Sequence, residues 1–447
     1  MSASPKADRK IVTENLFRPD AEMEFRIQSD TERHRKGFAR LVVKDAEGHP
    51  VEKAKVEIKQ TSHEFKFGCN MFLLDQFDDD AHNLAYEDAF AKVFNQAIIP
   101  FYWSDLEPEQ GNPRFTKDSE PIYRRPPPDR CLEVCHTRGI APKGHPLLWQ
   151  QFWPEWLPKD PAALRRVIEK RYQEISARYG NSIPTFDVCN EALALGGTHP
   201  LRDIGNHVDY AFELAEKYFP ASTTLVYNET TDNSFTHFRG EHTPMYMLCE
   251  HLAERYPLGA VGLQFHLFDR TPEKIENYRN ELLNPANIFR FLDLYAKLGL
   301  PLKLSEITIP GYTLVDDGEQ FQADVVEKLY RIWFSHPAMD EIDFWNLVDG
   351  TAAYSPRNTF EGENFFQGGL VNYDISPKAG YKVLDRLINE EWNTRDTLEI
   401  SAGKSAPFHG YYGGYEATIH HAGGVETVAF AHPKILNHEI TLTLKSL

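Results

Sequence analysis

Phe186-Asp187-Val188-Cys189-Asn190-Glu191 is a short apolar run of β-strand type that ends on two polar side chains. Runs of this kind recur at intervals of roughly 35–45 residues, and segments with helical periodicity separate them. Eight such runs alternating with helices predict an α/β fold, a closed parallel (β/α)8 barrel or TIM barrel. The eight runs lie near residues 65–68, 97–100, 140–143, 185–188, 224–227, 260–263, 302–304 and 342–344.

The two ends of the chain carry a different pattern, in which apolar and polar residues alternate. The first 20 residues are polar and are expected to be loosely ordered, and the alternation then runs from about Phe25 to Gln60. After Glu391 the helical pattern stops, and alternating segments follow at 416–419, 426–430 and 439–444. We expect one small accessory β domain, with its N-terminal part at 22–62 and its C-terminal part at 393–447, beside a catalytic barrel at 63–392. Two separate β flaps are the alternative.

Composition and charge narrow the class of partner. The chain has 447 residues, 41% of them hydrophobic and 26% charged, which is ordinary for a globular protein. Acidic residues outnumber basic ones, 66 to 48, and no dense Lys/Arg run could form a phosphate-binding surface. We therefore expect no nucleic-acid partner, and a neutral substrate fits the charge better. No run of about 18 apolar residues is present, so we expect no membrane span.

The cysteines indicate no disulfide framework, because their number is odd and only Cys131 and Cys135 are close in sequence. On a predicted helix this pair is expected to pack as small buried hydrophobes rather than to bind a metal. Such cysteine usage favours a reducing compartment. The N-terminal stretch MSASPKADRK also lacks the apolar core of a signal peptide. These features predict a cytoplasmic protein, or a secreted one if a leader has been removed.

Polar side chains end several of the apolar runs, and the carboxyl ends of the strands carry the active site in a barrel of this kind. Glu191 ends the fourth run, and Glu306 ends the seventh. Either glutamate alone would more often be a surface ion-pair partner. Together they suit cleavage of a glycosidic bond, which needs one carboxyl group held neutral as a proton donor and one carboxylate as a nucleophile. Other runs end on His145, Asn228, Glu229, Gln264, His266, Trp345 and Asp349.

Five stretches resemble motifs of the family-10 glycoside hydrolases, the xylanase family. The stretch Phe186–Leu193 resembles the strand-four motif W-D-V-V-N-E-A-L. The five stretches occur in the order of the family and at barrel-like spacing, over about residues 64–390. The other four are Gly144–Trp149, similar to G-H-T-L-V-W, Val261–His266, similar to I-G-L-Q-x-H, Leu304–Ile307, similar to I-T-E-L, and Phe344–Asp349, similar to F-W-G-x-x-D.

The resemblance implies a retaining mechanism, with Glu191 as acid and base and Glu306 as nucleophile. It implies that Asn190 bonds the sugar 2-hydroxyl and that His266 hydrogen-bonds Glu306 and keeps it ionised. Gln264 lies two residues before His266, on the same strand face, and is expected to orient the carboxylates.

The resemblance also implies contacts that hold the sugar. His145 is expected to contact a sugar hydroxyl, and Trp149 and Trp345 are expected to wall the site. Trp103 is the one clearly retained residue of a further substrate-binding motif. For His145 and His266 the alternative is a histidine whose ring nitrogens are hydrogen-bonded within the core or a loop. For Trp149 and Trp345 the alternative is ordinary packing in the barrel.

Three departures from the family pattern affect substrate recognition. The family has N-E-x-K-W after strand two, whereas this chain has Ile98-Ile99-Pro100-Phe101-Tyr102-Trp103 and lacks the polar trio. Gln150 follows Trp149 where the family commonly has His, and Ala352-Ala353-Tyr354 replaces the expected S-W after strand eight. A site built to bond sugar hydroxyls discriminates sharply, so these changes are expected to weaken or redirect xylose recognition.

The leading hypothesis is a glycoside hydrolase that cleaves β-1,4-xylosidic bonds in xylan or xylo-oligosaccharides by double displacement. One alternative is the same mechanism on another β-glycoside or a decorated glycan. A second is a non-catalytic carbohydrate-binding protein. We expect a carbohydrate partner, a monomer, and no metal or organic cofactor. The β domain is expected to be a structural brace, with a carbohydrate-binding module as the alternative.

Overall fold

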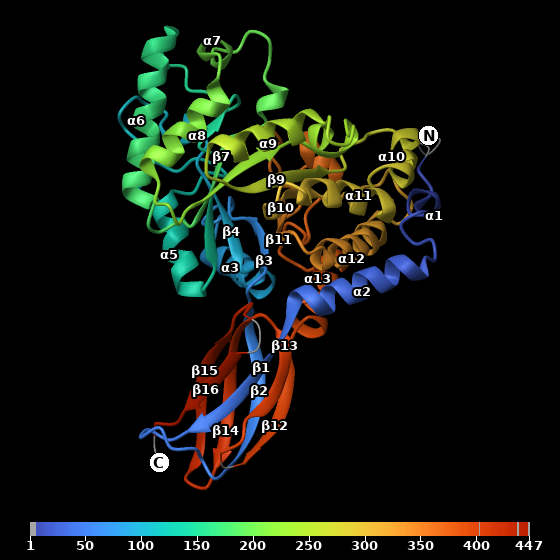
Figure 1. Ribbon diagram of the computed structural model, residues 1–447. Helices are drawn as coiled ribbons and strands as arrows, with labels where there is room; N and C mark the ends of the chain where they lie inside the picture. The colour runs from blue at the N-terminus through green and yellow to red at the C-terminus, as the bar shows by residue number, and fades with distance from the viewer. Residues whose placement is uncertain (1–5, 402, 436–437, 446–447) are drawn as a thin grey trace. The chain divides into compact units, whose positions relative to one another are not determined.

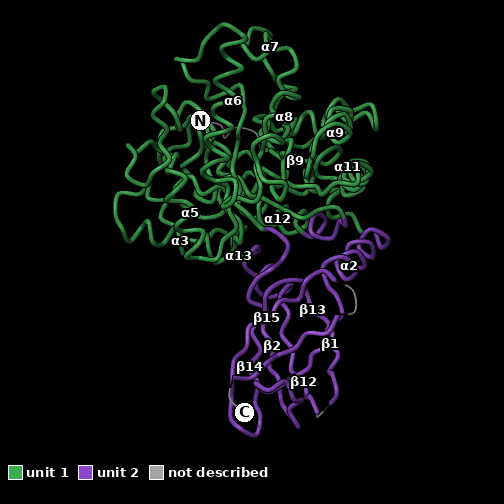
Figure 2. The backbone as a smooth tube through the Cα atoms, turned by 60° about the vertical axis from the view of Figure 1, so that its left-hand side comes forward, with its two compact units in different colours: residues 1–19, 67–330, 338–382 green, residues 20–66, 331–337, 383–447 purple. Residues whose placement is uncertain are grey.

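The computed structural model describes residues 6–401, 403–435 and 438–445. The chain divides into two compact units, which are coloured separately in Figure 2. Unit 1 comprises residues 1–19, 67–330 and 338–382, and unit 2 comprises residues 20–66, 331–337 and 383–447. Each unit is described by itself below.

Unit 1 is a closed parallel barrel, which confirms the predicted α/β fold (Figure 1). Neighbouring strands follow the chain order around the barrel, and pairing of β5 with β7 closes it. A two-residue strand, β6 (Leu148–Trp149), pairs with the end of β7. The eight barrel strands are β3 (Lys66–Asn70), β4 (Gln96–Pro100), β5 (Ala141–His145), β7 (Thr185–Asn190), β8 (Thr224–Glu229), β9 (Leu258–His266), β10 (Leu302–Thr308) and β11 (Met339–Phe344).

Helices connect successive barrel strands, and their ends follow from the local sequence. Asp160 caps α6 (Pro161–Tyr179) by accepting a hydrogen bond from the backbone N–H of Ala163. The helix α5 (Pro128–Arg138) ends at Gly139, whose φ of 68° is open to glycine without strain. The other helices are α1 (Arg9–Val12), α3 (Asp80–Val93), α4 (Trp103–Leu106), α7 (Leu201–Ile204), α8 (His207–Tyr218), α9 (Pro244–Arg255), α10 (Pro272–Asn277), α11 (Pro285–Ala296), α12 (Gly318–Ser335) and α13 (Ala379–Arg386).

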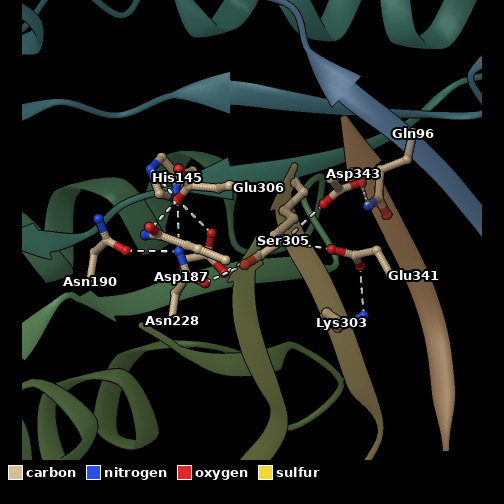
Figure 3. A network of polar contacts seen from close by, with 12 residues as sticks. Gln96, His145, Asp187, Asn190, Asn228, Lys303, Ser305, Glu306, Glu341 and Asp343 are labelled. Atoms are coloured by element: carbon tan, nitrogen blue, oxygen red, sulfur yellow. Dashed lines mark hydrogen bonds and ion pairs between the residues drawn. The ribbon is translucent and has the colours of Figure 1, made fainter. Parts of the chain in front are cut away.

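The barrel interior holds charged side chains beside its apolar layers. The Lys143 ammonium is fully buried and lies 2.5 Å from Glu341, 3.2 Å from Asp343 and 3.6 Å from Asp187. Glu341 and Asp343 are fully buried as well, and Gln96 donates to Asp343 over 3.0 Å (Figure 3). Buried charges of this kind persist only when they are paired and hydrogen-bonded. This network therefore depends on the side chains of several strands being held in register.

Unit 2 is a β-sandwich preceded by a helix. One sheet has the order β13-β1-β16 and the other the order β12-β2-β14-β15. The N-terminal strands β1 (Lys36–Lys44) and β2 (Lys53–His63) therefore pair with C-terminal strands, which confirms that both ends of the chain build one accessory β unit. The C-terminal strands are β12 (Arg395–Ser401), β13 (Ala406–Tyr411), β14 (Gly413–His421), β15 (Gly424–His432) and β16 (His438–Thr443).

The core of the sandwich follows the predicted alternation. Every second residue of β2 is buried from Ala54 to Gln60, and Val56 and Ile58 pack against β14 residues such as Ala417 and Ile419. Tyr415 is also buried here. Burial of Tyr411, Tyr412 and Tyr415 means that these rings do not form an exposed platform.

Three sequence expectations about the chain ends were wrong. Residues 21–35 form the helix α2 (Ala21–Arg35) instead of a strand, because Asp20 caps it and acidic residues occupy its first turn. The strands β12 and β13 were missed, since most side chains of β12 are exposed and polar and give no alternation. Within residues 6–19, Val12 and Leu16 are buried and Ala7 pairs with Val315, so this part of the N-terminal segment packs within unit 1; residues 1–5 lie outside the described residues.

Candidate active site

A cleft of about 850 Å³ opens among the residues that follow the carboxyl ends of the barrel strands. Both glutamates predicted from the sequence line it, Glu191 directly after β7 and Glu306 on β10. Six of the seven predicted substrate-binding residues line it too: Asn190, His145, Trp149, Gln264, His266 and Trp345. The barrel thus gathers residues from four of its strands, β5, β7, β9 and β10, and from the loops that follow the strands at one cavity.

Glu306 is the more deeply buried of the two glutamates, with 5% of its surface exposed. Its Oε1 atom accepts hydrogen bonds from the Asn228 side-chain amide at 2.9 Å and from the Gln264 amide at 3.1 Å. Nε2 of His145 lies 3.7 Å from Oε1, and Nε2 of His266 lies 3.5 Å from Oε2. These contacts fix the direction in which the carboxyl group faces the cleft.

Glu191 is held by its backbone as well as by its side chain. Its φ of 54° places it in the left-handed region, which is uncommon outside glycine and asparagine. Its backbone N–H donates to the Asn228 carbonyl at 2.9 Å, and its carbonyl accepts from the Gln150 amide at 3.2 Å. The carboxyl group accepts from Trp149 Nε1 at 3.0 Å and from Gln264 Nε2 at 2.9 Å. The Gln264 amide nitrogen is therefore shared by the two glutamates.

Burial changes the acidity of both carboxyl groups. Burial raises the pKa of Glu191 from 4.5 to about 7, and the charge of Glu306 raises it next. Burial also raises the pKa of Glu306 to about 7, but His145 and the Asn228 hydrogen bond oppose the rise. Two carboxyl groups this close cannot both ionise freely, so near neutral pH the pair holds one proton. The contacts that favour the ionised form are the charge of His145 and the Asn228 hydrogen bond at Glu306, and the Gln264 and Trp149 hydrogen bonds at Glu191.

Asn190 and Asn228 form an amide pair beside the glutamates (Figure 3). The Asn228 amide donates to Asn190 Oδ1 at 2.8 Å and to Glu306, and the Ser305 hydroxyl donates to Asn228 Oδ1. The Asn190 Nδ2 atom is buried and has no hydrogen-bond partner. Because an unpaired buried donor is costly, this nitrogen is suited to a ligand hydroxyl in the cleft.

The two cleft histidines are oriented differently. Nδ1 of His145 lies 2.7 Å from Asp187, so the carboxylate accepts its N–H and leaves Nε2 toward Glu306. Nδ1 of His266 lies 2.9 Å from the hydroxyl of Thr308, and burial lowers the pKa of His266 to about 4. His266 is therefore a neutral imidazole at ordinary pH.

Aromatic rings form one wall of the cleft. Phe72, Tyr102 and Trp345 pack as a buried cluster, with Trp149 and Phe152 against it. Tyr354 stacks on Phe152, and its hydroxyl donates to Gln151. Trp149 and Trp345 thus face the cleft, as predicted.

Trp103 does not line the cleft, so the sugar contact expected of it is not part of the candidate site. It is buried, donates its indole N–H to Glu107 at 3.1 Å and packs edge-on against Trp153 and Trp156. It lies at the start of the short helix α4 and takes no part in the cleft lining.

Five residues of functional interest went unassigned in the sequence. Asn228 ends the fifth predicted run, and that position was the signal that could have found it; Asp187 is a charged residue inside the otherwise apolar fourth run. Arg124 and Arg125 line the cleft from a loop and Glu363 from a short 3-10 helix, segments without a predictive periodicity. Glu229, which also ends a run, is fully buried and accepts hydrogen bonds from Tyr227, Leu193, Thr230 and Asn233, a structural role.

In the described ranges, no three His, Cys, Asp or Glu side chains are grouped as a metal ion would need. The five cysteines are free thiols and all are buried. No helix among the described residues has both the length and the apolar character that a membrane crossing requires.

A parallel barrel that opens on two carboxyl groups sharing one amide is an architecture suited to glycoside hydrolysis. The model of glycosyl hydrolase family 10 matches residues 62–385, and the chain belongs to this family.

Curated relatives are distant and mostly longer. An anti-sigma-I factor, RsgI6, of Acetivibrio thermocellus is 25% identical over 86% of this chain and 45% of its own length. Endo-1,4-beta-xylanase 3 of Arabidopsis thaliana is 23% identical over 85% of this chain and 45% of its own. The chain thus spans less than half the length of these two relatives.

Solved structures share the fold. Xylanase 10B of Thermotoga maritima superposes with a TM-score of 0.57 at 20% identity, covering 73% of this chain and 96% of that one. Xylanase 10B of Thermotoga petrophila, in complex with xylobiose, gives 0.56 at 19% identity, covering 73% and 95%.

The raised pKa values predict that the stability of the protein depends on pH even without substrate. Since the folded pKa of Glu306 lies above its ordinary value, its contribution to stability is present below about pH 4.5 and is lost as pH rises through about 7. Glu306→Gln should therefore raise the free energy of unfolding at pH 8 by about 2–3 kcal/mol more than at pH 5.

Calorimetric unfolding of the wild-type protein and of the Glu306→Gln variant at pH 5 and pH 8 measures this difference. Glu133→Gln, an exposed substitution on α5, is the matched control and should shift neither value. An equal change at pH 5 and pH 8 for Glu306→Gln would contradict the buried, proton-sharing pair.

Proposed function

We propose that the protein is a retaining glycoside hydrolase that cleaves β-1,4-xylosidic bonds in xylan or xylo-oligosaccharides. The observation that carries the proposal is the Gln264 amide, which hydrogen-bonds Glu191 at 2.9 Å and Glu306 at 3.1 Å at the floor of one cleft. Glycoside hydrolysis needs two carboxyl groups on either side of one glycosidic bond. No other two glutamates of the cleft are joined in this way among the described residues.

The distance between the two groups supports retention. Oxygen atoms that both bond one amide nitrogen lie no farther apart than the two hydrogen bonds laid end to end. That span falls short of the roughly 6.5 Å at which inverting enzymes begin, which hold a water molecule between their carboxyl groups. Direct attack by a carboxylate fits the narrower gap.

The proposed reaction has two displacements. Glu191 gives its proton to the glycosidic oxygen as the bond between that oxygen and C1 breaks, and a Glu306 carboxylate oxygen bonds to C1. Glu191, now ionised, takes a proton from water, whose oxygen attacks C1 and releases Glu306. A pKa of about 7 suits Glu191 to both steps, because the group is protonated in the first and ionised in the second.

Neighbouring side chains have supporting roles in this proposal. The unpartnered Asn190 Nδ2 donates to the sugar 2-hydroxyl, and the bond strengthens as positive charge develops at C1. His145, oriented by Asp187, and neutral His266 flank the Glu306 carboxylate. Trp149 and Trp345 provide apolar faces for the sugar ring.

Xylan as the substrate rests on the family and on the names of relatives. One feature favours a second candidate, the same mechanism on another β-glycoside. Where the family has a polar trio after strand two, this chain places Ile98 and Tyr102 in the aromatic cluster with Phe72. Fewer donors therefore face the sugar on that side, so a different or decorated glycan is the alternative substrate.

A glycan panel tests the proposal. Purified protein should hydrolyse xylan and xylo-oligosaccharides, and proton NMR of the first product formed should show the β-anomer. Glucan, mannan and small aryl β-glycosides serve as parallel substrates. Activity confined to a glycan without xylose would replace the substrate. Binding to glycans with no turnover would instead favour a non-catalytic carbohydrate-binding protein, and initial release of the α-anomer would contradict retention.

The acid role of Glu191 predicts a leaving-group effect. Glu191→Ala should lower kcat/KM on unactivated xylo-oligosaccharides by about 10²- to 10⁴-fold, because their alkoxide leaving group requires a proton. The rate on dinitrophenyl β-xyloside should fall far less, since that leaving group departs without one.

Steady-state rates on both substrates measure the difference, and Glu254→Ala on the exposed end of α9 is the control. Equal losses on both substrates would show that Glu191 is not the proton donor.

A further inference from the structure

Two consecutive arginines, Arg124 and Arg125, line the cleft from the loop before α5. Both are buried, with 4% and 7% of their surfaces exposed. The reaction proposed above uses neither of them. A buried guanidinium keeps its charge, so each one needs compensation from its surroundings.

Arg125 is compensated within the protein. Its Nε atom donates to the Asp105 carboxylate at 2.7 Å, and one Nη donates to the Arg124 carbonyl at 2.9 Å. Its guanidinium also lies 4.0 Å from the centre of the Tyr102 ring and 4.7 Å from that of Phe152. The charge of Arg125 is therefore balanced by a carboxylate and two aromatic faces.

Arg124 has no carboxylate partner among the described residues, and its guanidinium lies 5.4 Å from the centre of one aromatic ring, that of Phe72. Its guanidinium donates to uncharged acceptors, the Thr351 carbonyl and Asn346 Oδ1, the latter at 3.0 Å. Its Nε atom is buried and without a partner, and across the described residues no carboxylate lies within ion-pair distance of it. Glu363 lines the same cleft and makes no ion pair with Arg124, although its charge favours the cation from a distance. Burial, and next the charge of Arg125, lower the pKa of Arg124, so its charge lacks a partner in direct contact.

The backbone commits Arg124 to this position. Its φ is 61°, in the left-handed region, and its N–H donates to the Gln76 side chain at 3.1 Å. Both acceptors of its guanidinium lie in the loop after β11, close to Trp345. An unbalanced cation is thus fixed beside the aromatic wall of the candidate sugar site.

We propose that Arg124 binds the carboxylate of an acidic sugar in the cleft, so that the protein prefers glycans that carry a uronic acid. The proposal rests on the proposed function, since it names the kind of glycan that this same cleft takes. A carboxylate supplies the missing counter-charge and accepts from a planar guanidinium in a directed pair. The uronic acid is either a side branch on a xylan chain or the sugar that occupies the site itself.

The experiment compares substrates that differ only in one carboxyl group. Xylo-oligosaccharides with a single glucuronic acid branch are measured beside the same compounds after reduction of the carboxyl to an alcohol. Aryl β-glucuronide and aryl β-glucoside form the second pair, which tests a uronic acid in the main position. The full chain should show kcat/KM roughly ten- to a hundredfold higher on the acidic member of one pair. Preference in the first pair identifies a branch, and in the second a uronic acid at the cleavage site.

Three substitutions test whether Arg124 causes the preference for the acidic substrate. Arg124→Gln should bring the acidic-to-reduced ratio of kcat/KM close to one, whatever its effect on the rate with the reduced substrate. Arg124→Lys keeps the charge and should retain part of the ratio, and it serves if the glutamine variant fails to fold. Arg138→Gln on α5 removes a half-buried arginine that pairs with Glu87 and Asp88 and does not line the cleft, and it should leave the ratio unchanged.

The outcomes separate this proposal from the proposed function. Turnover of neutral xylo-oligosaccharides with a ratio at or below one in the wild-type protein would overturn the Arg124 proposal alone. An acidic preference that Arg124→Gln does not reduce would overturn it too. If no glycan is hydrolysed, calorimetric titration with the same branched oligosaccharides decides: tighter binding of the acidic member, lost in Arg124→Gln, supports the proposal, and equal binding contradicts it.

Discussion

Two carboxyl groups buried against one amide nitrogen are the constraint on which the rest of the site depends. Glu191 and Glu306 both bond Gln264 Nε2, so their oxygens are held within a short distance in one cleft. Burial raises both pKa values to about 7, helped at Glu191 by the charge of Glu306 and at Glu306 by that of Asp187, and the pair keeps one proton. A proton donor and a carboxylate in such proximity are costly to folding but are what a two-step displacement requires.

The barrel offsets the cost of burying the two carboxyl groups because its strands position the side chains that contact them. Asn228 from β8 bonds both Asn190 and Glu306, and His145 from β5 is held by Asp187 from β7. Asp187 in turn lies 3.6 Å from buried Lys143. A chain of contacts therefore runs from the charged barrel interior to the Glu306 carboxylate, and the left-handed backbone of Glu191 completes the arrangement from the other side.

The sequence predicted the barrel and most of the cleft because two physical patterns coincide there. Strands buried on both faces give short apolar runs, and the carboxyl ends of parallel strands meet at one mouth, so polar residues ending those runs converge. Glu191, Glu306, Gln264 and His266 were found in this way. Trp103 was expected at the cleft, but it lies in the short helix α4 after β4, and its ring packs against Trp153 and Trp156. Arg124 and Arg125 come from a proline-rich loop whose path depends on distant contacts. The polar strand β12 and the helix α2 were not predicted because their sequences show no clear periodicity.

Trapping the covalent intermediate tests most directly whether Glu306 is the nucleophile and Glu191 the proton donor. A dinitrophenyl 2-deoxy-2-fluoro-β-xylobioside slows both displacements, but its good leaving group lets the first proceed, so a glycosyl-enzyme accumulates. Peptide mass spectrometry should find one fluoroxylobiosyl group, on the peptide that contains Glu306. Attachment at Glu191, or steady turnover of xylo-oligosaccharides without any labelled peptide, would contradict the account.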